Sequence, residues 1–151
     1  MKSLELQPTH ENLFDTFISD SIGRSKDIVA FADILNSIDE SCSIALDARW
    51  GAGKTFFIKQ TKMILDAFNE YIPSHDEDDN DSIRSYCDRI HKQNPMEYIP
   101  QVAIYYDAWA NDNDEDPVLS LVLSILENVN SSFSFKEGSG IFTKAAAVLE
   151  I

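Results

Sequence analysis

The sequence predicts an α/β fold in which helices cover a parallel β-sheet. A short apolar run at 42–47 is typical of a buried parallel strand. A glycine-rich turn and a helical pattern at 54–70 follow it, and 101–110 is a second strand-like run rich in Val, Ile and Tyr. This order of elements favours a layered parallel sheet. Because such sheets usually have about five or six strands, a sheet with only these two is predicted to be incomplete.

The first helix is predicted over 25–38, with Ser25 placed to cap its N-terminus. The strand "CSIALD" at 42–47 comes next, followed after the glycine turn by the helix at 54–70. The apolar stripe of the first helix consists of Ile28, Phe31, Ala32, Leu35 and Ile38, and that of the second of Phe57, Ile58, Ile64, Leu65 and Phe68.

Residues 73–100 interrupt this pattern and are predicted to form a mobile insertion. Their acidic run, "HDEDDNDS" at 75–82, is expected to be a solvated loop, and only 81–93 has helical spacing. The strand "QVAIYYDAWA" at 101–110 follows.

A last long helix is predicted over 118–129, with Asp116 as its cap and Pro117 in its first turn. Because this helix is apolar on nearly every side, we expect it to be deeply buried. After it, 131–151 is predicted to be a loop and the start of a further helix.

The composition is that of one globular domain. Of the 151 residues, 44% are apolar and 25% charged, and the formal net charge of −14 argues against nucleic-acid binding by the bulk surface. No apolar run reaches about 18 residues and no secretory signal opens the chain, so a cytoplasmic protein without a membrane span is expected. Cys42 and Cys87 are expected to be reduced, a disulfide being the alternative.

Two acidic runs, at 75–82 and 111–117, contain the oxygen ligands that Ca²⁺ prefers. Neither has the central glycine and later glutamate of an EF-hand loop, so solvated loops are expected there instead of metal sites. The histidines His10, His75 and His91 have no metal-ligand spacing and are given no role.

The segment 48–55, "ARWGAGKT", matches the phosphate-loop pattern G-x-x-x-x-G-K-[ST] except at its first position. Gly51 and Gly53 allow successive amides to form an anion nest. Lys54 is expected to contact the β- and γ-phosphates and to be catalytic, and Thr55 to bind Mg²⁺. The predicted nucleotide-binding residues are Trp50, Gly51, Ala52, Gly53, Lys54, Thr55 and Phe56.

Ala48 stands where the pattern has its first glycine. The change costs about 1 kcal/mol if this residue needs a positive φ, and close to nothing otherwise. A short glycine–lysine match also arises by chance, but its place between a predicted strand and a predicted helix favours phosphate binding. For Arg49 an exposed side chain is favoured over a phosphate contact.

Two motifs, in this order, resemble those of the KAP family of P-loop NTPases. Trp50 directly precedes Gly51, and the sequence "YDAW" at 106–109 follows the second predicted strand. The resemblance covers roughly 20–130. It implies a three-layer P-loop NTPase core of the additional-strand type, with a parallel sheet, ATP as nucleotide and Mg²⁺ as cofactor. Bacterial members are often linked to phage or plasmid exclusion and to membrane-associated defence.

By this resemblance, 25–130 is the N-terminal part of the NTPase domain, including the acidic insertion at 73–100. A lead-in at 1–24 precedes it, and 131–151 follows. The family's second acidic motif and its γ-phosphate-sensing arginine come further downstream, and this chain contains neither. We therefore expect the opening portion of a larger domain.

Asp107 ends an apolar run and is a candidate Mg²⁺ ligand. No second acid follows it, so an aspartate that caps or orients the turn at Trp109 is favoured. Trp109 itself is expected in the core. Trp50 is expected to pack beneath the phosphate loop, contact with the nucleotide being the alternative.

The favoured function is Mg-ATP binding by a P-loop NTPase module with little hydrolysis by this chain alone. ATPase activity is expected only with the rest of the domain, because no water-activating carboxylate is evident. The expected partners are the nucleotide and either an unknown protein or the remaining C-terminal part of the domain. The alternatives are a truncated, non-catalytic interaction module and a P-loop small-molecule kinase, against which the scarcity of arginine argues.

Overall fold

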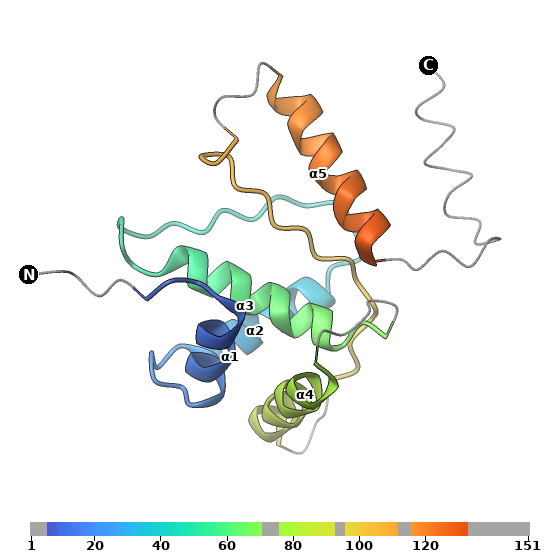
Figure 1. The fold of residues 1–151 in the computed structure, drawn as a ribbon. Helices are drawn as coiled ribbons and strands as arrows, with labels where there is room; N and C mark the ends of the chain where they lie inside the picture. Colours follow the sequence, from blue (N-terminus) through green and yellow to red (C-terminus); the bar gives the residue numbers. More distant parts are fainter. Residues whose placement is uncertain (1–5, 71–75, 93–95, 112–115, 133–151) are drawn as a thin grey trace, which may run out of the picture.

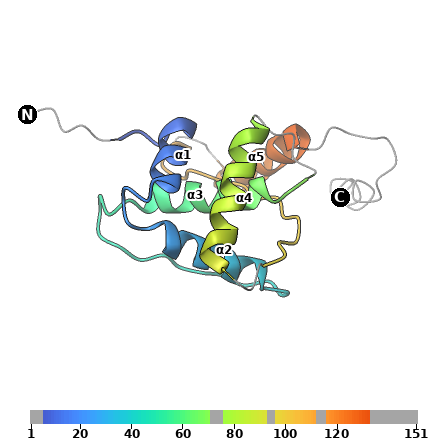
Figure 2. The ribbon, with the colours of Figure 1, turned by 90° about the horizontal axis from the view of Figure 1, so that it is seen from below.

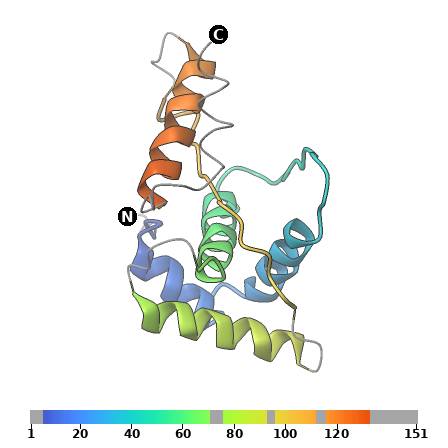
Figure 3. The same cartoon turned by 90° about the vertical axis from the view of Figure 1, so that its right-hand side faces the viewer.

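The computed structural model describes residues 6–70, 76–92, 96–111 and 116–132, and the regular structure in these ranges is helical (Figure 1). None of the helices in these ranges is long and apolar enough to cross a membrane. Four helices surround a shared core, whereas the last stands apart from them (Figures 1 and 3). The helices are α1 (His10–Ile18), α2 (Ser25–Asn36), α3 (Lys54–Ala67), α4 (Glu77–His91) and α5 (Pro117–Ser132).

The predicted α/β class, with its three-layer core and parallel sheet, is wrong for the described residues. The predicted strands at 42–47 and 101–110 have no strand structure. Neither 42–47 nor 101–106 forms a backbone–backbone hydrogen bond within the described part of the chain. A strand requires a neighbouring strand that pairs with its backbone. Apolar and β-branched residues favour a pleated, half-buried surface, but they do not supply that neighbour.

The core lies between α1, α2, α3 and α4, with α3 contacting each of the other three (Figure 2). Its members on α2 and α3 recur with helical spacing, so the helical periodicity predicted for these two segments is confirmed. Of the predicted stripes, Phe31, Ile38 and Ile58 are not members of this core. Burial of one large apolar side chain contributes about 1.5–3 kcal/mol to stability. The buried members are Phe17, Ile28, Val29, Ala32, Ile64, Leu65, Ala67, Ile83, Cys87 and Tyr98.

The turn between α1 and α2 caps α2, and the prediction that Ser25 is the cap is wrong. Arg24 is the N-cap and Ser25 the first helical residue. The Ser25 N–H donates to Asp20 Oδ1 at 3.0 Å, and its hydroxyl donates to the Phe17 carbonyl at 2.8 Å. The N–H bond holds the pKa of the Asp20 carboxyl below its usual value. Helix α1 itself lies within 1–24, which the sequence suggested only as a lead-in.

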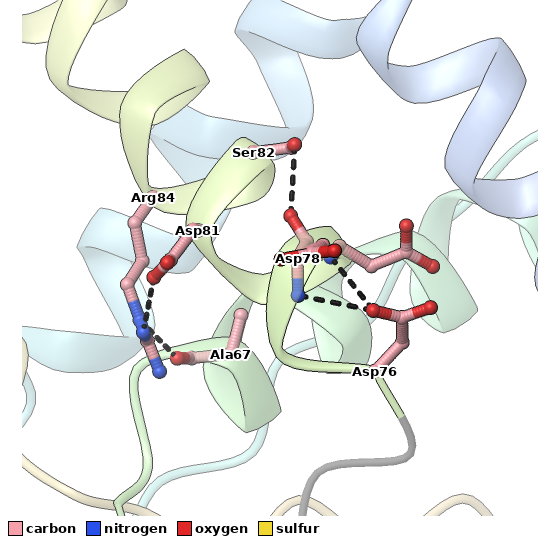
Figure 4. A network of polar contacts seen from close by, with 7 residues as sticks. Ala67, Asp76, Asp78, Asp81, Ser82 and Arg84 are labelled. Atoms are coloured by element: carbon pink, nitrogen blue, oxygen red, sulfur yellow. Dashed lines mark hydrogen bonds and ion pairs between the residues drawn. The ribbon is translucent and has the colours of Figure 1, made fainter.

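Helix α4 begins at Glu77, inside the acidic run that was expected to be a solvated loop. Its N-cap is Asp76, whose Oδ1 accepts from the N–H groups of Asp78 at 3.0 Å and Asp79 at 3.4 Å (Figure 4). Acidic side chains are favourable at the positive N-terminal end of a helix. The acidic run from 77 onward therefore starts the helix, and the loop prediction is wrong there. His75 lies outside the described residues.

The same helix is part of the core, so the prediction of a mobile insertion is also wrong for α4. Ile83 and Cys87 are buried among side chains of the other helices. Arg84 ties α4 to the end of α3, because its Nε donates to the Ala67 carbonyl at 2.6 Å (Figure 4). Its Nη1 also bonds Asp81 Oδ1 at 2.9 Å.

Two asparagine side chains hold the segment after α4 against α2 and the end of α3. Asn36 Nδ2 donates to the Glu97 carbonyl at 2.9 Å, and its Oδ1 accepts from the Ile99 N–H at 2.8 Å. Asn69 Nδ2 donates to the Gln101 carbonyl at 2.7 Å. Asn36 therefore satisfies one backbone donor and one backbone acceptor, as a neighbouring strand would.

Helix α5 starts as predicted but is not buried. Asp116 Oδ1 accepts from the N–H groups of Val118 at 3.0 Å and Leu119 at 3.2 Å, which confirms the predicted cap. The Tyr106 hydroxyl donates to Ser120 Oγ at 3.2 Å and links α5 to the segment before it. The expected deep burial is wrong because α5 has too few neighbours in the described part of the chain (Figure 1). Its exposed apolar side chains are Val118, Leu119, Leu121, Val122, Leu123 and Ile125.

Two sequence predictions fall wholly or largely on residues whose structure is not described. In the second acidic run, 112–115 lies outside the described residues. The same holds for 133–151, which includes the further helix expected near the end of the chain.

Candidate nucleotide-binding site

The glycine turn before α3 has the backbone shape of an anion nest. Gly51 has φ 77° and Gly53 φ 84°, both in the left-handed region that other residues adopt only with strain. The Ala52 N–H donates to the Arg49 carbonyl at 3.1 Å and closes the turn. Apart from the glycine and its two chain neighbours, no atom of the described residues lies within 4 Å of a Cβ built on either glycine. Conformation therefore requires glycine here, and the space around the turn is open.

The positive end of α3 is open to solvent. Its N-cap is Gly53, which has no side chain to accept from the first N–H groups, and no acidic residue lies in the first turn. The amides of Lys54, Thr55 and Phe56 are thus free of a side-chain cap within the described residues. The other four helices have side-chain acceptors at their N-termini, namely Thr9, Asp20, Asp76 and Asp116. An uncapped N-terminus with a dipole directed at solvent suits an anion.

The Lys54 ammonium lies over the loop. Its Nζ donates to the Ala48 carbonyl at 2.5 Å and to the Arg49 carbonyl at 3.2 Å. An ammonium has three donors, so one remains for a ligand while these two bonds hold the group in place. The same loop continues into the nest amides, so the ammonium and these amides belong to one short segment.

Ala48 fits the loop without backbone strain. It does not have a positive φ, so the glycine of the general pattern is not required for conformation in this structure. Its contact with Lys54 uses the backbone carbonyl, which every residue has. Of the two free-energy costs considered for alanine at position 48, the one close to zero therefore applies.

The remaining predicted site residues differ in exposure. Thr55 is exposed in the first turn of α3, where its hydroxyl is accessible to a cation, and Phe56 is half-buried. Arg49 is exposed, as the sequence favoured. Thr55 and Phe56 belong to the first turn of α3, and Arg49 to the loop before it.

Trp50 and Trp109 are both exposed and contact each other. Their exposed fractions are 88% and 79%, and their ring centroids lie 6.3 Å apart at an interplanar angle of 80°. The predictions that Trp50 packs beneath the loop and that Trp109 lies in the core are therefore wrong. Each ring projects from a turn and finds the other ring as its neighbour. The sequence did not indicate this contact, although a tryptophan in each of the two motifs was the available signal.

Asp107 organises the turn that carries Trp109. Its Oδ1 accepts from the N–H groups of Trp109 at 3.1 Å and Ala110 at 3.3 Å. The Tyr105 hydroxyl lies 3.4 Å from its Oδ2. Burial, and then the charge of Asp107, raises the pKa of Tyr105. The capping role considered for Asp107 from the sequence matches this geometry, and its role as a Mg²⁺ ligand stays a prediction.

Tyr105 also connects this segment to the helix behind the loop. The Lys59 ammonium of α3 lies 4.7 Å from the centroid of the Tyr105 ring, a cation–π contact. The turn at Asp107 and the phosphate loop are thus joined through α3 as well as through the tryptophan pair.

A comparison with known protein families identifies the family to which the chain belongs. The KAP family P-loop domain matches residues 24–148, which is most of the chain and includes both motifs. This chain belongs to the KAP family of P-loop domains. No curated protein and no solved structure matches the chain. The matched range includes the loop at 48–55. The match agrees with the resemblance inferred from the two motifs.

Proposed function

We propose that this KAP-family chain binds Mg-ATP through the loop at 48–55. The observation that carries the proposal is the uncapped N-terminus of α3, with the Lys54 ammonium fixed beside it. A single anionic group placed there would meet both the helix-end amides and a positive charge. The proposed nucleotide-binding residues are Trp50, Gly51, Ala52, Gly53, Lys54, Thr55 and Phe56.

Each residue has a separate task in this proposal. The amides of 51 and 53–56 donate to phosphate oxygens, while the Ala52 N–H stays bonded to the Arg49 carbonyl. Lys54 uses its remaining donor toward the β- and γ-phosphates. The exposed Thr55 hydroxyl is the group that would hold Mg²⁺. Bound Mg²⁺ supplies neutralisation of phosphate charge. Lys54 would be the catalytic residue in a hydrolysing form of the domain, because it neutralises charge that develops during phosphoryl transfer.

Binding with little turnover is the expected behaviour of this chain by itself. Hydrolysis needs a carboxylate that orients or activates water, and Ala108 and Trp109 follow Asp107 where a second acid would stand. One carboxylate oxygen of Asp107 already accepts two backbone N–H groups. A role for Asp107 in holding Mg²⁺ would therefore rest on its other oxygen.

A titration with a fluorescent ATP analogue in the presence of Mg²⁺ tests the proposal. We expect saturable binding by the wild type and about a ten- to hundredfold loss in Lys54→Ala, because a hydrogen bond to a charged group contributes about 1.5–3 kcal/mol. Lys26→Ala is the matched control, since this exposed lysine of α2 lies outside the loop. No saturable signal, or equal binding by wild type and Lys54→Ala, would end the proposal.

The exposed apolar side of α5 favours a second candidate, a protein-interaction module that does not depend on nucleotide. The partner would be another protein or a further part of the same domain. The two candidates differ in a thermal melt. A ligand that binds only the folded state raises the melting temperature, so an unchanged melt with Mg-ATP would favour the interaction module.

A further inference from the structure

The tryptophan pair links two segments that are far apart in the sequence and that both end in tightly bonded turns. Trp50 follows the two residues whose carbonyls hold the Lys54 ammonium. Trp109 is held by the Asp107 carboxylate, which accepts its N–H. The two rings meet edge to face, 6.3 Å between centroids. Edge-to-face contact is a favourable arrangement for aromatic rings.

Trp50 directly follows the two residues that hold the Lys54 ammonium. The Lys54 ammonium bonds the carbonyls of Ala48 and Arg49. It is therefore held by the backbone that directly precedes Trp50. Any movement of 48–50 would change where the ammonium is held and how the nest amides are oriented. A contact that restrains Trp50 therefore restrains the predicted phosphate-binding groups.

We infer that Trp109 is a positioning residue of the nucleotide site and acts through Trp50. Its ring holds Trp50, and Trp50 in turn fixes the backbone that places Lys54. The inference rests on the proposed function. In the absence of Trp109 the loop must be ordered by the nucleotide itself, and this ordering reduces affinity. In the wild type, the turn at Asp107 and the start of α5 would change conformation when the loop binds phosphate, because Trp109 connects them to Trp50.

Affinity measurements on Trp109 variants test the inference. We expect Trp109→Ala to weaken Mg-ATP binding about three- to tenfold, the range that one aromatic pair provides. Trp109→Phe keeps an aromatic ring and should restore affinity to within about twofold of the wild type. Ile99→Ala is the control, since Ile99 is an exposed apolar residue at 60%, in a segment held to the C-terminal end of α2.

Fluorescence provides a readout that a merely structural role would not change. The chain has two tryptophans, so Trp50→Phe leaves Trp109 as its only one. Trp109 lies outside the loop, and its emission should change saturably with Mg-ATP because the contact transmits the change. The same variant keeps a ring at position 50 and tests the contact even if Trp109→Ala fails to fold.

The outcomes separate the inference from the proposed function. If the wild type binds Mg-ATP and Lys54→Ala does not, while Trp109→Ala binds like the wild type, the inference is overturned and the proposed function stands. An unchanged Trp109 emission during saturable binding overturns it too. If the wild type itself fails to bind Mg-ATP, both fall together.

Discussion

At the scale of single residues, the contact between the Lys54 ammonium and the Ala48 carbonyl holds the lysine over the loop. The ammonium meets the Ala48 carbonyl at 2.5 Å, so the lysine is restrained before any ligand arrives. Restraint of a charged group in its binding position avoids an entropic cost on association. Because the carbonyl makes the contact, the methyl group of Ala48 has no part in it.

Ala48→Gly, which restores the glycine of the general phosphate-loop pattern, should therefore change little. We expect the affinity for Mg-ATP to stay within about twofold of the wild type and stability to fall by a few tenths of a kcal/mol, because glycine adds freedom to the unfolded chain. Gly53→Ala should cost about 1–2 kcal/mol, since its φ of 84° strains any L-residue. Urea denaturation and a parallel titration measure both effects. A large gain in affinity in Ala48→Gly would contradict the geometry described.

Cys87 should make stability depend on pH in the alkaline range. Burial, followed by the charge of Asp33, raises the pKa of its thiol from 9.0 to about 12. The folded protein therefore keeps a proton that the unfolded chain releases earlier. The resulting stabilisation is complete below about pH 9 and is lost as the pH rises toward about 12.

We expect the urea midpoint of the wild type to fall across this alkaline range, and to fall less steeply in Cys87→Ala. In the folded protein a thiol reagent should modify the exposed Cys42 and leave Cys87 unmodified until unfolding. Rapid labelling of both thiols under native conditions would show that α4 does not bury Cys87 against the other helices.

At the scale of elements, side chains form hydrogen bonds with backbone N–H and C=O groups that have no backbone partner among the described residues. Asn36 bonds the backbone of the 97–101 segment, and Asp76 caps α4. Helix α3 is the exception, because its first amides have no such cap from any residue that the structure describes. In the described part of the chain, α3 is thus the helix whose N-terminal amides lack a side-chain cap, as the proposed nucleotide site requires.

Asn36→Ala should destabilise the fold by about 1–3 kcal/mol, because it leaves a backbone donor and a backbone acceptor without their partner. Ser37→Ala is the neighbouring control. Its hydroxyl is exposed and, among the described residues, bonds only the Ile34 carbonyl one turn back, so a change within about 0.5 kcal/mol is expected. Chemical denaturation compares the two variants. Equal stability of Asn36→Ala and the wild type would show that the extended segment is not held by this side chain.

At the scale of the whole molecule, the sequence predicted the helices better than their surroundings. Periodicity identified α2 and α3, and Asp116 correctly marked the start of α5. These signals are local, since a stripe and a cap depend on residues within a few turns. The glycine turn at 48–55 matches a sequence pattern for the same reason, because its residues are contiguous.

The predictions that failed depended on distant neighbours. The runs at 42–47 and 101–110 have strand composition, yet a strand forms only if a second strand lies beside it. Trp50 and Trp109 were assigned to buried positions from their size, but each ring packs on the other at the surface. Helix α4 was placed too late because its acidic first turn resembles a solvated loop until the cap is considered.

Amide hydrogen exchange tests the helical architecture across the whole molecule. Amides in the middle of α3 should be protected, since they are bonded within a helix beside the core. Amides at 42–47 and 102–106 should exchange quickly, because they form no backbone hydrogen bonds in the described part of the chain. Strong protection at both segments would restore the sheet that the sequence suggested.

The most direct measurement of the central claim is an NMR titration of the isotope-labelled chain with Mg-ATP, followed through its backbone amides. The claim is that an uncapped helix end and one ammonium form a triphosphate site. We expect saturable shifts centred on Gly51, Gly53, Lys54 and Thr55, and their loss in Lys54→Ala. Saturable shifts confined to other parts of the chain, or none at all, would contradict the claim.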